Sequence, residues 1–97
     1  AVAGSRVELV QGRWEDVRPD WGPFDLIFFD GGMSEPGLQA VIAMLAPGGI
    51  LIKDDMTPGR AVEGDPVREA LLRDDRLTGI EILTTPESAA ILAVRRS

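Results

Sequence analysis

Residues 24–30 read FDLIFFD, a nearly continuous apolar run that ends in an acid. About one helix later, residues 45–55 read LAPGGILIKDD, a second apolar run that ends in two acids. Unbroken runs of this kind are typical of strands that are covered on both faces, as in parallel α/β sheets. Because such sheets bind ligands at their carboxyl edge, the terminal acids Asp30, Asp54 and Asp55 are candidate site residues.

The flanking segments predict strands and helices in alternation. A short strand is expected at residues 7–10. Apolar residues at helical spacing predict a helix between Ser34, which can cap it, and the Pro-Gly-Gly turn at 47–49. Asp65 followed by a proline predicts the start of a second helix, because this pair is a strong N-terminal signal.

The chain ends in two strand-like segments with no room for a helix between them. Residues 78–84 and 89–94 flank a turn at 85–88, and this arrangement predicts an antiparallel hairpin. The expected fold class is therefore α/β, with a mostly parallel, Rossmann-like sheet that ends in an antiparallel β-hairpin.

Composition narrows the classes of function. The 97-residue chain has a net charge of −6, and its arginines, Arg68 and Arg95 among them, are scattered between acids and are expected to be solvated. This pattern argues against nucleic-acid binding. The chain has no Cys and no His, so it offers no thiolate nucleophile and no imidazole base. No apolar run reaches the ~18 residues of a membrane span, and we expect a cytoplasmic protein that binds no membrane.

Three stretches together resemble the second half of a class I S-adenosylmethionine-dependent methyltransferase. They are residues 7–17 (VELVQGRWEDV), the acid-ended run at 24–30, and the Leu-Ala-Pro-Gly-Gly step at 45–49 into a strand at 50–52. The tail at 66–77 (PVREALLRDDRL) resembles the end of the small-molecule, catechol-type O-methyltransferases. The resemblance covers essentially all of residues 1–97, which it implies are the C-terminal part of one methyltransferase domain. The glycine-rich cofactor loop of the family is not in these residues.

The resemblance implies where S-adenosylmethionine would bind. Trp14 would pack against the adenine ring, and Glu15 or Asp16 would accept a hydrogen bond from its amine. Alternatively, Trp14 is an ordinary packing aromatic and the two acids begin a helix. The implied cofactor-binding residues are Gly12, Arg13, Trp14, Glu15 and Asp30.

The same resemblance implies catalysis by Asp30 and Asp54. Asp30 can orient the acceptor, take its proton, or join Asp54 and Asp55 in binding Mg²⁺ through three oxygen ligands. Two departures weaken the metal site: Asp55 stands where the family has an amide, and Met33 stands where it has a lysine. A metal-free alternative has Asp54 or Asp55 bind an amine or hydroxyl substrate directly, and a plainer one has these acids merely end a strand.

The expected function is methyl transfer to a hydroxyl of a small molecule, carried out as part of a longer chain. The alternative is a non-catalytic, methyltransferase-like module that serves as a dimerisation or interaction surface. In the family, two further strands lie between the strand at 7–10 and the strand at 24–29. One edge of the strand at 24–29 would therefore be unpaired here. We therefore expect a homodimer or a swapped assembly.

Overall fold

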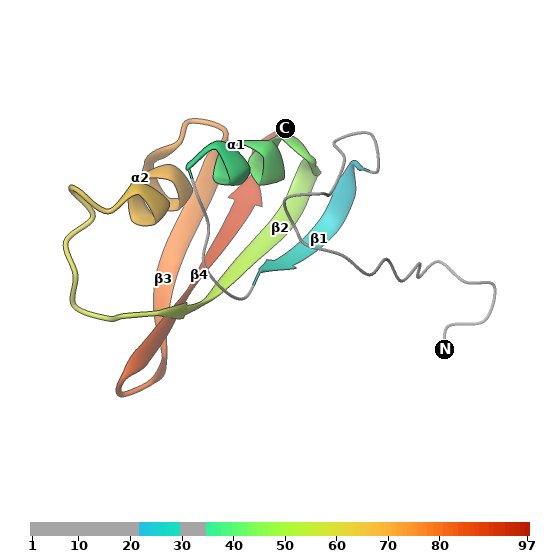
Figure 1. The fold of residues 1–97 in the computed structure, drawn as a ribbon. Coiled ribbons are helices and arrows are strands. Elements are labelled where there is room, and N and C mark those ends of the chain that lie inside the picture. Colours follow the sequence, from blue (N-terminus) through green and yellow to red (C-terminus); the bar gives the residue numbers. More distant parts are fainter. Residues whose placement is uncertain (1–21, 30–34) are drawn as a thin grey trace, which may run out of the picture.

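The computed structural model describes residues 22–29 and 35–97, which form one sheet and two helices (Figure 1). In chain order, the elements are β1 (Phe24–Phe29), α1 (Glu35–Ala43), β2 (Leu45–Met56), α2 (Pro66–Arg73), β3 (Leu77–Thr85) and β4 (Ser88–Arg95). Every strand and helix predicted over this part of the chain is present. The strand predicted at residues 7–10 lies outside the described residues.

The start of α2 follows its sequence signal, whereas the end of α1 does not. Asp65 caps α2, because its side chain accepts a hydrogen bond from the backbone N–H of Arg68 at 3.2 Å, and a proline occupies the first turn. The helical pattern before the 47–49 turn ran further than the helix does. α1 ends at Ala43, and Leu45 already pairs with Phe24 in the sheet. Strand pairing, a long-range interaction, therefore sets this end.

The sheet has the order β1-β2-β4-β3. β1 and β2 are parallel, whereas β4 pairs antiparallel with both β2 and β3. The predicted α/β class is confirmed, and so is the closing antiparallel hairpin. Within the described strands, the parallel part is the β1–β2 pair, so the carboxyl ends of β1 and β2 lie at the same edge.

The core lies between the sheet and the two helices, which cover the same face (Figure 1). α2 lies so close to β3 that a Cβ on Gly79 would stand 2.3 Å from the carbonyl oxygen of Leu71. Only glycine permits this approach. The fully buried apolar side chains of this core include Leu38, Ile42, Leu51, Leu71, Ile91 and Ala93.

The opposite face of the sheet is apolar and is not covered by the described helices. Leu26 and Phe28 are each 60% exposed, and Ile80 is 56% exposed. The register aligns Phe28 with Ile52, Ile52 with Leu92, and Leu92 with Ile80, so one apolar row crosses all four strands. We call this surface the open sheet face; its residues are Leu26, Phe28, Ile50, Ile52, Ile80, Ile82, Leu92 and Val94.

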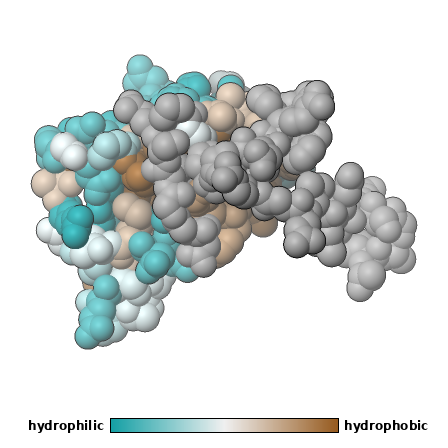
Figure 2. Space-filling model, in the orientation of Figure 1, coloured by the Kyte–Doolittle hydropathy of each residue, from teal (hydrophilic) through white to brown (hydrophobic). Residues whose placement is uncertain are grey.

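The other surfaces are more polar. In the view of Figure 2, hydrophilic residues are frequent over α2 and the segment before it, and hydrophobic residues reach the surface nearer the sheet. Neither described helix has the length and apolar character needed to cross a membrane.

Candidate functional site

Two of the predicted site residues lie in the described part of the chain, side by side at the carboxyl end of β2. Asp54 is half-buried and Asp55 is exposed. This is the edge at which ligands bind in α/β sheets. The other predicted residues, Gly12, Arg13, Trp14, Glu15 and Asp30, lie outside the described residues, so their approach to Asp54 stays a prediction.

The backbone at this pair is irregular. Lys53 pairs with Ile91, but the next partners are Met56 and Ala89, so β2 carries one residue more than β4 over this interval. Such a β-bulge re-aims the side chains around it. Asp55 has a φ of 63°, which no other non-glycine residue in the described part of the chain shares in sign. A left-handed, non-glycine residue at a ligand edge is a recurrent mark of functional sites.

Lys53 is a further residue of this edge, and no role for it was predicted from the sequence. It lies within β2, and its side chain is only 5% exposed. Its Nζ donates a hydrogen bond to the backbone carbonyl of Asp54 at 2.5 Å. Among the described residues, no carboxylate lies within ion-pair distance of this ammonium. A lysine that interrupts an apolar run just before two acids was the available signal.

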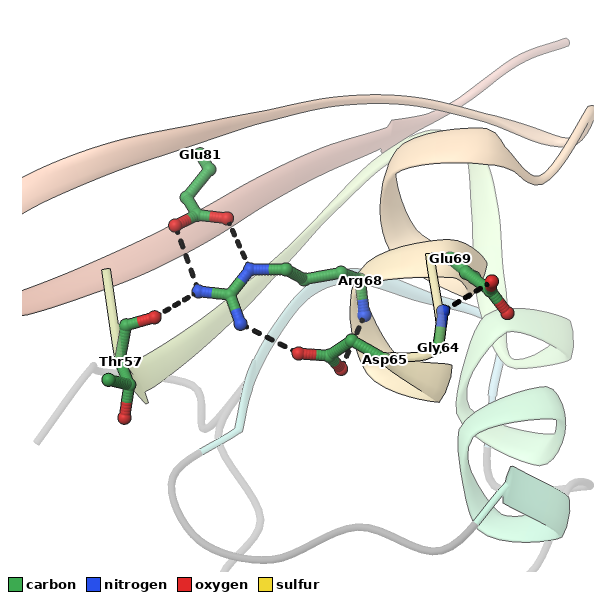
Figure 3. Close-up of polar contacts among 6 residues, drawn as sticks. All are labelled: Thr57, Gly64, Asp65, Arg68, Glu69 and Glu81. Atoms are coloured by element: carbon green, nitrogen blue, oxygen red, sulfur yellow. Dashed lines mark hydrogen bonds and ion pairs between the residues drawn. The ribbon is translucent and has the colours of Figure 1, made fainter. Parts of the chain in front are cut away.

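Arg68 corrects the expectation that the arginines are solvated. Its side chain is 1% exposed, and its guanidinium meets Glu81 through Nε–Oε1 at 2.7 Å and Nη2–Oε2 at 3.0 Å (Figure 3). Nη1 donates to Asp65 Oδ2 at 2.7 Å, and Nη2 also donates to the backbone carbonyl of Thr57. Arg68 therefore ties β3 and the start of α2 to the segment that leaves β2.

These contacts shift the ionisation of the groups involved. Hydrogen bonding to Glu81 is the largest effect on Arg68 and raises the pKa of its guanidinium, so this cation persists at any working pH. Partial burial by itself would raise the pKa of Asp65. The hydrogen bonds and the charge of Arg68 together outweigh that effect and hold the pKa of this carboxyl below its usual value.

The described residues alone do not make a metal site. Within residues 22–29 and 35–97, no three Cys, His, Asp or Glu residues are placed to hold an ion. The predicted Mg²⁺ site needs Asp30 beside Asp54 and Asp55, and Asp30 lies outside the described residues. Metal binding therefore stays a prediction. A shallow hollow between α1 and α2 contains none of the predicted site residues; its lining is Gln39, Pro66, Glu69, Ala70, Arg73 and Asp74.

The chain was compared with models of protein families, with curated proteins and with solved structures. No model of a protein family matches the sequence, and no curated protein does. Cofactor-bound Rv0187 from MTB matches 95% of this chain with a TM-score of 0.59 and 23% identity, over 50% of its own length. A candidate O-methyltransferase from Klebsiella pneumoniae matches 78% of this chain with a TM-score of 0.47 and 20% identity, over 42% of its own length.

The first of these matches shows the fold. The chain spans half the length of Rv0187 and has the fold of that half. The predicted Rossmann-like half-domain is thus confirmed as a fold.

Proposed function

We propose that residues 1–97 form the C-terminal half of an S-adenosylmethionine-dependent methyltransferase that acts on a hydroxyl of a small molecule. The observation that carries this proposal is the acidic pair at the end of β2. Asp54 and Asp55 lie at the carboxyl end of a strand that pairs parallel with β1, at a bulge with a left-handed backbone, on the edge where this fold binds ligands. The half-length match to a cofactor-bound protein supports it.

The carboxylates at the end of β2 suit the chemistry of methyl transfer. Methyl transfer from a sulfonium is an in-line displacement whose leaving group is already activated, so the protein mainly has to align donor and acceptor. A carboxylate at a strand end can accept the acceptor's hydroxyl hydrogen bond and take its proton as the new bond forms. Asp54 is the residue we assign to this step, and Asp30 would share it. The absence of His and Cys from the chain is compatible with this reaction.

The open sheet face supports the proposal that this is one part of a larger domain. One apolar row of this face, which runs from Phe28 through Ile52 and Leu92 to Ile80, crosses all four strands. Phe28 and Ile80 are more than half exposed. Sheets with parallel strands are normally covered on both faces, whereas α1 and α2 cover only one here. We infer that polypeptide from the other half of the domain covers the open sheet face.

The same surface favours the second candidate, a non-catalytic module. An apolar face of this kind can serve for dimerisation or for docking of another protein, and such a role requires neither the cofactor nor Asp54. The two candidates differ in whether the completed domain binds S-adenosylmethionine.

Calorimetric titration with S-adenosylhomocysteine separates the candidates. We expect no binding to residues 1–97 alone, because the glycine-rich loop of the family is not among them. A polypeptide that also carries the other half of the domain should bind with micromolar affinity. If that longer polypeptide is folded and still does not bind, the non-catalytic module is the better account.

A further inference from the structure

Two buried cations hold the backbone on either side of Asp55. Lys53 and Arg68 are the charged side chains that are buried within the described part of the chain. Each donates a hydrogen bond to a main-chain carbonyl: Lys53 to that of Asp54, and Arg68 to that of Thr57. The four-residue segment from Asp54 to Thr57 is thus fixed at both ends.

The bond from Lys53 acts directly on the unusual conformation of Asp55. A peptide unit is planar, so fixing the direction of the Asp54 carbonyl also fixes the direction of the Asp55 N–H. That orientation is the one that accompanies the φ of 63° at Asp55. Without this restraint, Asp55 would be free to return to the right-handed region that its Cβ prefers, and both carboxylates would be re-aimed.

The bond from Arg68 ties the other end of the segment to rigid elements. The same guanidinium is held by Glu81 on β3 and by Asp65 at the start of α2 (Figure 3). The Thr57 carbonyl therefore takes its position from the sheet and the helix together. A buried arginine with three partners in a fixed fork has little freedom to move.

We propose that Lys53 and Arg68 are positioning residues of the methyl-acceptor site, which hold Asp54 and Asp55 in the orientation that the acceptor hydroxyl needs. The inference rests on the proposed function for the identity of the acceptor. Neither cation contacts the substrate; both act through the backbone of residues 54–57. Such preorganisation by a supporting layer is a common requirement of precise sites.

A double-mutant cycle on folding tests the contact with Asp55 without any activity. Lys53→Met is made in the wild-type chain and in Asp55→Gly, and unfolding constants are measured by denaturant titration. Removing a buried ammonium has the same intrinsic effect in both backgrounds. Glycine adopts a left-handed φ without help. Lys53→Met should therefore raise the unfolding constant several-fold more in the wild-type background than in the Asp55→Gly background. Equal factors in both backgrounds would refute the role of Lys53.

A second experiment separates positioning from general stability. In the complete methyltransferase, Lys53→Met and Arg68→Lys should lower the rate of methyl transfer at least tenfold, with unchanged affinity for S-adenosylhomocysteine. Arg73→Met, which breaks the exposed pair with Glu63 on the same helix, is the matched control and should leave both quantities unchanged.

The outcomes distinguish the two proposals. Equal losses of transfer and cofactor affinity in Lys53→Met would show a merely structural role and overturn this inference. A wild-type protein that transfers no methyl group would overturn the proposed function, while the folding cycle would still decide whether Lys53 restrains Asp55.

Discussion

Arg68 shows how one side chain can bear a full charge in the interior. Removing a guanidinium from water costs several kcal/mol, and this cost is offset only if the partners are well placed. Here, the Arg68 guanidinium donates two hydrogen bonds to Glu81, one to Asp65 and one to the Thr57 carbonyl. The sequence could not assign this burial, since an arginine at a helix position is ordinarily solvated. The signal was distributed over Asp65, three residues earlier, and Glu81 on another strand.

We predict that Arg68→Met lowers the free energy of unfolding by about 3–5 kcal/mol, because it leaves two half-buried carboxylates without their partner. Denaturant titration of the purified chain measures this change. Arg73→Met removes a pair whose members are both more than half exposed, and it should cost less than about 1 kcal/mol. Similar losses for the two variants would show that Arg68 is not the buried anchor described here.

The same cluster predicts a loss of stability in acid. The pKa of Asp65 is lower in the folded chain than its ordinary value. Its contribution is therefore complete above that ordinary value, near pH 4, and is lost as the pH falls through the lower folded value. Thermal melts across this range should show a decline that is shallower in Asp65→Asn. An equally steep decline in that variant would show that Asp65 does not cause the loss of stability in acid.

At the scale of elements, local signals predicted which segments would be strands and helices, and long-range contacts decided their ends. The Asp65 start of α2 and the β3–β4 hairpin follow from residues adjacent in sequence. The bulge at Asp55 does not, because it is defined by the pairing of β2 with β4. Arg95 gives another example. From the end of β4, its side chain donates to the carbonyls of Ile42 in the last turn of α1 and of Leu45 at the start of β2.

The close packing of α2 on β3 gives a test at this scale. We predict that Gly79→Ala destabilises the chain by about 1–3 kcal/mol, because the new Cβ would meet the Leu71 carbonyl at 2.3 Å and force the helix away. Thr78→Ala, at the exposed neighbouring position of β3, is the control. It removes one exposed hydrogen bond, which Arg96 donates to the Thr78 hydroxyl at 3.0 Å, and it should destabilise the chain less than Gly79→Ala does. Comparable stability of the two variants in a denaturant titration would mean that α2 does not lie this close to the strand.

At the scale of the molecule, the open sheet face and the edge of β1 are the surfaces that need a partner. Within the described strands, β1 pairs only with β2. An apolar face and an unpaired edge both promote association. The expected homodimer or swapped assembly is therefore a prediction for residues 1–97 in isolation; in the complete domain we expect the other half to occupy these surfaces.

Substitutions at two adjacent positions of β3 test the open sheet face and the opposite face of the sheet independently. Ile82 belongs to the open sheet face, whereas Leu83 is 67% exposed and points to the other side of the strand. Light scattering should show that the isolated chain self-associates, that Ile82→Glu reduces the association, and that Leu83→Glu does not. A well-folded monomer at all concentrations, or equal effects of the two substitutions, would contradict this assignment.

The central claim is that the acidic end of β2 serves methyl transfer. The most direct measurement is the rate at which the complete domain transfers labelled methyl from S-adenosylmethionine to small hydroxyl compounds, compared between wild type and Asp54→Asn. We predict a loss of about 10²–10⁴-fold in the variant, with its affinity for S-adenosylhomocysteine retained. Transfer by Asp54→Asn at the wild-type rate would contradict the account.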